Sequence, residues 1–156
     1  EFLYLVMGQI FQKNIHMATF FMCPHCEGHL KVGDYIIFAT KTSRKNKGLL
    51  LLHPEVGNYS SIKHPSYSFR KGDPLEFFCP LCQTSLASEI DKNLARVLML
   101  DEHHKMHEIY FSRIAGEHST YKVSDEEVWS TGEHSSRYTY FKFPYEHRRY
   151  TRKKPR

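Results

Sequence analysis

The sequence of 156 residues contains little alanine and has no long hydrophobic run. Its longest apolar stretches are only a handful of residues, whereas a membrane-spanning helix needs about 20, so we expect no membrane association. Alanine is the best helix former, while phenylalanine and tyrosine, which favour strands, number 11 and 10. The composition therefore predicts a β-rich protein.

The beginning of the sequence has no basic leader and no small-residue cleavage site, although residues 1–7 are apolar. A secretory signal has both features, so we expect a cytoplasmic protein. Met17 is a natural start, and residues 1–16 are expected to be an N-terminal extension that is not native. The length suits one domain, which we place at residues 17–143, followed by a flexible basic tail over residues 144–156.

The net charge of +5 arises from the end of the chain. Residues 142–156 hold seven Lys and Arg side chains and one acid, Glu146, which leaves 15 basic and 16 acidic residues in the other 141. The body of the protein is therefore close to neutral, and we expect no broad basic face on it.

All four cysteines fall in two copies of one pattern, F-x-C-P-x-C-x-x-x-L, which are offset by 56 positions. The first copy contains Cys23 and Cys26, and the second contains Cys79 and Cys82. Two thiolates at this spacing can reach one metal ion from a tight turn, and two such turns complete a tetrahedral site. In a reducing compartment a disulfide framework is not expected. We therefore predict one four-cysteine metal site, with zinc favoured over iron.

The two F-x-C-P-x-C segments resemble the knuckles of zinc-ribbon and rubredoxin-type proteins, and the whole chain resembles small, uncharacterised bacterial zinc-ribbon proteins. The resemblance covers the two ten-residue segments and implies no activity. The 52 residues between Cys26 and Cys79 exceed a minimal ribbon's spacer, which predicts an extra hairpin. Rubredoxin-type iron sites usually have glycine after the second cysteine of a knuckle, whereas this chain has Glu27 and Gln83. This difference favours zinc, with an electron-transfer or thiol redox protein as the alternative.

The pattern of apolar and turn residues predicts roughly seven to nine short strands and one or two short helices. The expected strands lie at 35–40, 49–52, 75–78, 97–100, 106–112, 120–123, 128–130 and 137–143, and the expected helix lies at 86–93. Residues 55–65 read as an irregular loop, and the run Leu49–Leu52 predicts a strand buried on both faces. The predicted fold is all-β or β-rich α+β, with zinc-ribbon-type knuckles joined to antiparallel hairpins.

Two basic segments are candidates for contact with RNA or DNA. Residues 41–48 predict a hairpin loop, and the end of the chain interleaves basic residues with aromatic ones, as stacking on bases requires. No known RNA- or DNA-binding signature is present, so a protein of the nucleic-acid machinery is the other candidate partner. The candidate contact residues are Lys41, Arg44, Lys45, Lys47, Arg148, Arg149, Arg152, Lys153 and Lys154.

Histidines suggest two further sites, and each has a plainer explanation. G-E-H-S occurs at 116–119 and 132–135, which invites a hydrolytic interpretation. Because a nucleophile needs a base oriented by a third group, we favour two similar turns that lead into two strands. His103, His104 and His107 fall near a predicted turn, where no cysteine or carboxylate pattern completes a metal site. We therefore expect a binding module without catalytic residues.

Overall fold

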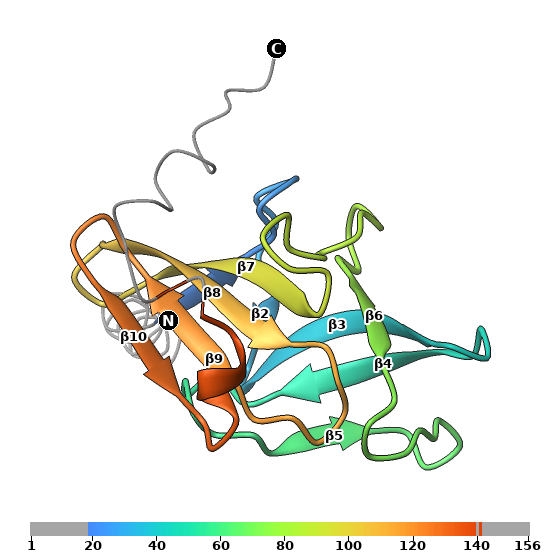
Figure 1. Cartoon of the computed structure of the whole chain (residues 1–156). Coiled ribbons are helices and arrows are strands. Elements are labelled where there is room, and N and C mark those ends of the chain that lie inside the picture. The colour runs from blue at the N-terminus through green and yellow to red at the C-terminus, as the bar shows by residue number, and fades with distance from the viewer. Residues whose placement is uncertain (1–18, 140, 142–156) are drawn as a thin grey trace, which may run out of the picture.

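The computed structural model describes residues 19–139 and residue 141, where regular structure is almost entirely strand (Figure 1). A turn of 3-10 helix, Ser135–Arg137, follows the last strand, and no helix in this part of the chain is long and apolar enough to cross a membrane. The all-β prediction is confirmed for these residues. The predicted extension and basic tail lie outside them. The ten strands are β1 (Phe20–Met22), β2 (Lys31–Val32), β3 (Tyr35–Thr42), β4 (Lys47–Leu52), β5 (Ser61–Lys63), β6 (Leu75–Phe78), β7 (Leu94–Leu100), β8 (Met106–Ser112), β9 (Thr120–Val123) and β10 (Val128–Thr131).

The strands form two antiparallel sheets of five strands each. Sheet A has the order β1-β7-β8-β9-β10, and sheet B has the order β2-β3-β4-β5 with β6 also paired to β3. The short strands β2 and β6 share one edge of β3, because β2 pairs with Tyr35 and Ile36 whereas β6 pairs with residues 39–42. The two cysteine segments adjoin these two strands, so they meet at this edge of sheet B.

The inner faces of the two sheets pack together in the main hydrophobic core. Along β3, buried and half-buried residues alternate, as in a strand with one covered face. Phe38, Phe77 and Phe111 come from three strands, and their ring centroids lie 5.2–5.5 Å apart. Burial of a phenylalanine stabilises a fold by about 1.5–3 kcal/mol, so this cluster is a main source of attraction between the sheets.

A smaller core lies on the other face of sheet A. The Tyr121 ring stacks on Phe141 with centroids 4.3 Å apart, and the Tyr121 hydroxyl donates a hydrogen bond to the carbonyl of Ser135. Sheet A is thus covered on both faces, whereas no described element covers the outer face of sheet B. The members of this core are Leu94, Tyr110, Tyr121, Tyr138 and Phe141.

Strand β4 has one covered face, so the predicted burial on both faces is wrong. Leu50 points into the core and is 4% exposed, whereas Leu49 is 55% exposed. Leu51 pairs on the outer face with Ile62 of β5, a strand that lies within the predicted loop at 55–65. That loop prediction is therefore wrong for three residues, which are too few to show an alternating pattern in the sequence.

The helix predicted at 86–93 is wrong, since this segment is an irregular loop. The N–H of Leu86 donates to the carbonyl of Phe77 in β6. The side chains of Ser88 and Asp91 each accept a hydrogen bond from the backbone N–H two residues further on. Such local side-chain bonds compete with helical hydrogen bonding, and the backbone is instead drawn to the neighbouring strands.

The strand predicted at 137–143 is also wrong for the residues that the structure describes. Arg137 ends the 3-10 turn, and Tyr138, Thr139 and Phe141 belong to no strand, while the rest of that range lies outside the described residues. Tyr138 and Phe141 are each 5% exposed, because they pack into the smaller core. An irregular segment that buries its aromatic side chains produces the same polar–aromatic alternation as a strand.

Candidate metal centre

The two cysteine turns are built alike, one after β1 and the other after β6. In the first, the N–H of Cys23 donates to the carbonyl of Gly28 at 3.0 Å, and the N–H of Glu27 donates to the carbonyl of Cys23 at 2.9 Å. The second turn repeats both hydrogen bonds around Cys79, at 3.0 and 2.9 Å, with Gln83 in the place of Glu27. The sequence repeat therefore corresponds to a structural repeat of the backbone.

Glu27 and Gln83 follow the second cysteine of each turn and have left-handed backbone conformations, with φ of 59° and 61°. Glycine adopts this conformation without strain, whereas another residue pays of order 1 kcal/mol. The difference from the rubredoxin pattern therefore concerns the side chains and not the backbone conformation. The backbone of these turns does not distinguish zinc from iron.

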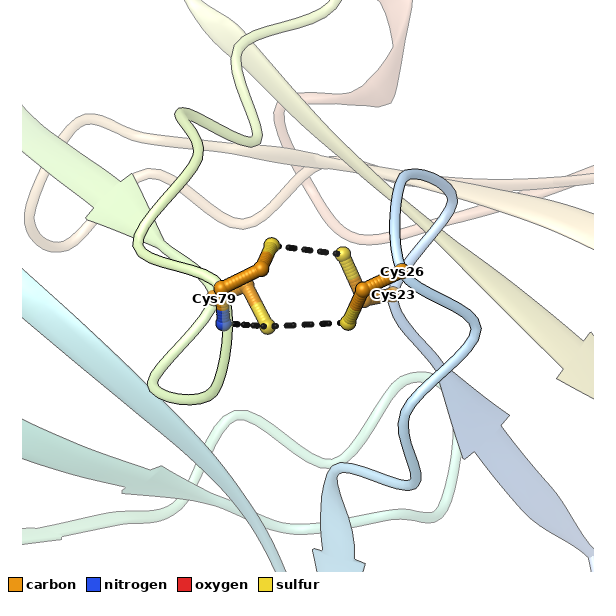
Figure 2. Close-up of side chains that lie close together, drawn as sticks. Cys23, Cys26 and Cys79 are labelled. Atoms are coloured by element: carbon orange, nitrogen blue, oxygen red, sulfur yellow. Dashed lines mark hydrogen bonds between the residues drawn. The ribbon is translucent and has the colours of Figure 1, made fainter.

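The two turns face each other and bring the four cysteine sulfurs together (Figure 2). All four Sγ atoms lie within 4.8 Å of one another. The Cys23–Cys82 and Cys26–Cys79 pairs are each separated by 3.8 Å between Sγ atoms. A tetrahedral ion with metal–sulfur distances of about 2.3 Å requires sulfur–sulfur distances of about 3.8 Å. The four cysteines are free thiols and could hold one metal ion.

Backbone N–H groups point at the sulfurs, as a set of thiolates requires. The N–H of His25 lies 3.3 Å from Cys23 Sγ, that of Gly28 lies 3.4 Å from Cys26 Sγ, and that of Leu81 lies 3.4 Å from Cys79 Sγ. Hydrogen bonds to the charged form favour that form. The donor arrangement therefore suits negatively charged sulfurs at these three positions, as around a cation.

The four thiols differ in burial, and the pKa values of Cys23 and Cys82 are shifted in opposite directions. Cys23 and Cys79 are buried, whereas Cys26 and Cys82 are exposed. Burial raises the pKa of the Cys23 thiol to about 12, because the charged form loses its solvation. A hydrogen bond with the Thr84 hydroxyl lowers the pKa of Cys82 to about 6. A metal ion bound by this set would therefore displace protons, above all from Cys23.

The turns also touch each other through residues that the sequence pattern does not identify. The ring of His25 donates from Nε2 to the carbonyl of Ser85 at 3.1 Å, so this side chain links the first turn to the second. A Cβ atom on Gly28 would overlap the side chain of Leu81, so glycine permits the close approach of the turns. The two knuckle copies carry different residues at these positions, and the sequence holds no signal for these contacts.

The hairpin of β3 and β4 carries four of the residues predicted to contact nucleic acid. Lys41 and Lys47 lie opposite each other in the pairing register, and Arg44 and Lys45 are exposed in the turn between the strands. Lys41 also lies 3.5 Å from the carboxylate of Glu76. The five predicted residues of the tail lie outside the described residues, so the structure brings together the hairpin group alone.

The histidines near residue 104 do not form a metal site. His107 is buried, and its Nε2 lies 2.8 Å from Asp101 Oδ2. His103 is exposed beside Glu102, and His104 has a left-handed backbone with φ of 60°. Within the part of the chain that the structure describes, the four cysteines are the only group of three or more side chains placed to share a metal ion.

The two G-E-H-S segments lie together and do not form independent turns. The backbone N–H of His118 donates to His134 Nδ1 at 3.0 Å, and the N–H of His134 donates to the carbonyl of His118 at 3.0 Å. Glu133 lies 3.3 Å from His118 Nδ1. The first segment leads into β9 as predicted, but the second leads into the 3-10 turn, because these hydrogen bonds fold it back onto the first.

The chain is thus a β protein with a cluster of four cysteines suited to a metal ion. Comparison with protein-family models, curated proteins and solved structures gives no match, so the resemblance to zinc-ribbon proteins rests on the two cysteine segments alone.

Proposed function

We propose that this protein is a zinc-stabilised interaction module without catalytic activity. The observation that carries the proposal is the convergence of four sulfurs, all within 4.8 Å of one another, from turns that are far apart in the sequence. Four-thiolate sites are typical of structural zinc, whereas catalytic zinc keeps a position open for water or substrate. Four cysteine ligands leave no such position.

The placement of the turns explains what zinc would stabilise. The first turn leads from β1 in sheet A to β2 in sheet B, and the second leads from β6 in sheet B towards β7 in sheet A. An ion shared by the turns would therefore join sheets A and B at the two described connections between them, β1 to β2 and β6 to β7. The free energy of metal binding becomes free energy of folding when the unfolded chain has no preformed site.

Elemental analysis of protein purified without added metal tests the proposal. We expect one zinc ion per chain and a colourless protein, and Cys79→Ser should lose the metal and loosen the fold. Gln83→Asn is the matched control, because it changes an exposed residue in the same turn and asparagine tolerates positive φ. A red protein with one iron ion and reversible reduction would instead support electron transfer, and a metal-free, stable protein would reject the metal centre.

We further propose that the β3–β4 hairpin contacts the phosphates of a nucleic acid. Arg44 and Lys45 project at its tip, while Lys41 and Lys47 flank the strands. Lys41 also lies 5.4 Å from the ring centroid of Phe78, which places an aromatic ring beside the basic group. Aromatic rings beside basic side chains are the usual combination in surfaces that bind single strands.

Binding of fluorescent RNA and DNA oligonucleotides over a range of salt concentrations tests this surface. Reversing two charges, with Arg44→Glu and Lys45→Glu together, should weaken binding and reduce the slope of log affinity against log salt by about 1.4, or about 0.7 per lost phosphate contact. Lys92→Glu is the control on an exposed loop outside the hairpin. Unchanged binding by the double variant would refute the hairpin's part, and failure of both oligonucleotides to bind would favour a protein partner.

A further inference from the structure

An open cavity of about 310 Å³ lies between the inner faces of the two sheets. Its walls include the aromatic cluster of Phe38, Phe77 and Phe111, together with Val97 and Ile109 of sheet A. Protein interiors are close-packed, and few of their voids are larger than a water molecule. A hollow of this size that opens beside the main core is therefore a candidate ligand pocket.

The burial of inward-facing side chains gives independent evidence for the hollow. Leu50 and Ile109 face the core and are each 4% exposed. Leu52 and Phe111 face the same core, but they are only partly buried and pack at its margin. Both line the cavity. Apolar surface that points inward thus remains uncovered by any described side chain.

The entrance of the cavity carries polar groups held in place by the G-E-H-S segments. Tyr59, from the connection between β4 and β5, stacks on His118 with ring centroids 4.2 Å apart and planes 11° apart. The Tyr59 hydroxyl lies 3.0 Å from Thr120 Oγ1 and donates to the carbonyl of Thr131 at 3.1 Å. Glu133 lies 3.3 Å from His118 Nδ1. Nε2 of His118 is therefore the ring nitrogen left for a ligand.

We propose that this cavity binds an uncharged, largely apolar molecule of about a dozen non-hydrogen atoms that carries one hydrogen-bonding group. A dry apolar cavity of about 150 Å³ accommodates benzene, so one twice as large holds about twice as many atoms. The partly buried ring of Phe111 favours an aromatic ligand, since ring edges and faces attract each other. Most of the wall is aromatic and aliphatic, which disfavours a charged ligand; of the polar side chains that also line the cavity, Arg113, Glu117 and His118, we assign the polar group of the ligand to His118.

Titration of the metal-replete protein with 2-naphthol, followed by the NMR signals of its methyl groups, tests this proposal. We expect saturable binding of one molecule per chain, with shifts at the methyl groups of Leu52, Val56 and Ile109. The methyl groups of Leu51 and Ile62, on the outer face of sheet B, should not shift. Absence of saturable shifts, or shifts confined to the outer face, would overturn the proposal.

Variants that fill the cavity provide the second arm of the experiment. Leu52→Trp should raise the Kd for 2-naphthol at least tenfold, whereas Leu51→Trp, on the opposite face of the same strand, should leave it within twofold. Val56→Trp fills the same space from the loop after β4, and it replaces Leu52→Trp if that variant does not fold. Equal affinity of a folded cavity-filling variant and its control would refute binding between the sheets.

The polar end of the ligand is tested by comparing two probes. His118→Phe should weaken binding of 2-naphthol severalfold and leave binding of naphthalene, which has no hydroxyl, nearly unchanged. An equal loss for both probes would refute the assignment of the hydrogen-bonding group to His118.

Discussion

Replacement of Gly132 by alanine should destabilise the protein more than the same replacement at any other turn glycine that the structure describes. Gly132 has φ of +100°, and a Cβ atom there would overlap the backbone carbonyl of His118 and lie 2.5 Å from the Tyr59 hydroxyl. The carbonyl cannot withdraw freely, because it accepts the hydrogen bond from His134. The added methyl group therefore forces apart the two G-E-H-S segments.

The magnitude follows from comparison with Gly72, which has φ of +92° but no atom within 4 Å of the position of a Cβ. A non-glycine residue at positive φ destabilises the folded state by about 1–3 kcal/mol. Alanine also lowers the conformational entropy of the unfolded chain, which offsets about 0.4–1 kcal/mol of this cost. Gly72→Ala should therefore cost about 1 kcal/mol. Gly132→Ala adds the clash, and we expect a total of at least about 3 kcal/mol, as for other disruptive changes in packing.

Urea denaturation of the metal-replete variants measures both costs under one condition. The expected difference of about 2 kcal/mol between them corresponds to a factor of about 30 in the unfolding equilibrium. Because both glycines have nearly the same φ, the difference isolates the contact with His118 and Tyr59. If the two variants unfold at the same urea concentration, the close approach of the G-E-H-S segments is wrong.

Three further measurements test other parts of the structure. Removal of the metal by a strong chelator should lower the melting temperature by at least about 15 °C, as expected when metal binding supplies several kcal/mol of folding free energy; an unchanged melting curve would contradict a structural role. Asp101→Asn should lower stability at neutral pH. The hydrogen bond with His107 lowers the pKa of Asp101 to about 2, below the unfolded value of about 3.9. The stabilisation from the Asp101 carboxylate is therefore fully present above about pH 4 and is lost as the pH falls through 2. Urea unfolding at a series of pH values should show the parent and variant converging in that window, and a difference independent of pH would reject this hydrogen bond. Leu50→Ala should cost about 2–5 kcal/mol and Leu49→Ala no more than about 0.5 kcal/mol, and similar costs would contradict the orientation of β4.

Much of the strand arrangement was predictable because its signals are local. The strands predicted at 75–78, 106–112 and 120–123 coincide with β6, β8 and β9, since each is a short segment rich in aromatic and β-branched residues and bounded by turn residues. The meeting of the four cysteines was predictable because one ion needs four ligands, whatever the path of the chain between them.

The remaining features depend on contacts between distant segments. The loop at 86–93 has the composition of a helix, but its backbone bonds to neighbouring strands. Leu49 cannot be distinguished from Leu50 by composition, because the exposed face is set by which side of sheet B lacks a covering layer. The pairing of His118 with His134 joins two turns that share the sequence G-E-H-S, but the repeat alone does not indicate that the turns bond to each other. The left-handed conformations of Glu27 and Gln83 are likewise set by the geometry of the knuckles and not by residue type.

The split edge of β3 suggests that an ion held by the four cysteines would also limit aggregation. β3 has eight residues, and one of its edges is covered only by the two residues of β2 and the four residues of β6. Each of these short strands adjoins a cysteine turn. When the turns separate, β2 and β6 lose their anchor, and the freed backbone of β3 can pair with a strand of another molecule. A bound ion would thus prevent aggregation through pairing of β3 edges as well as stabilise the fold.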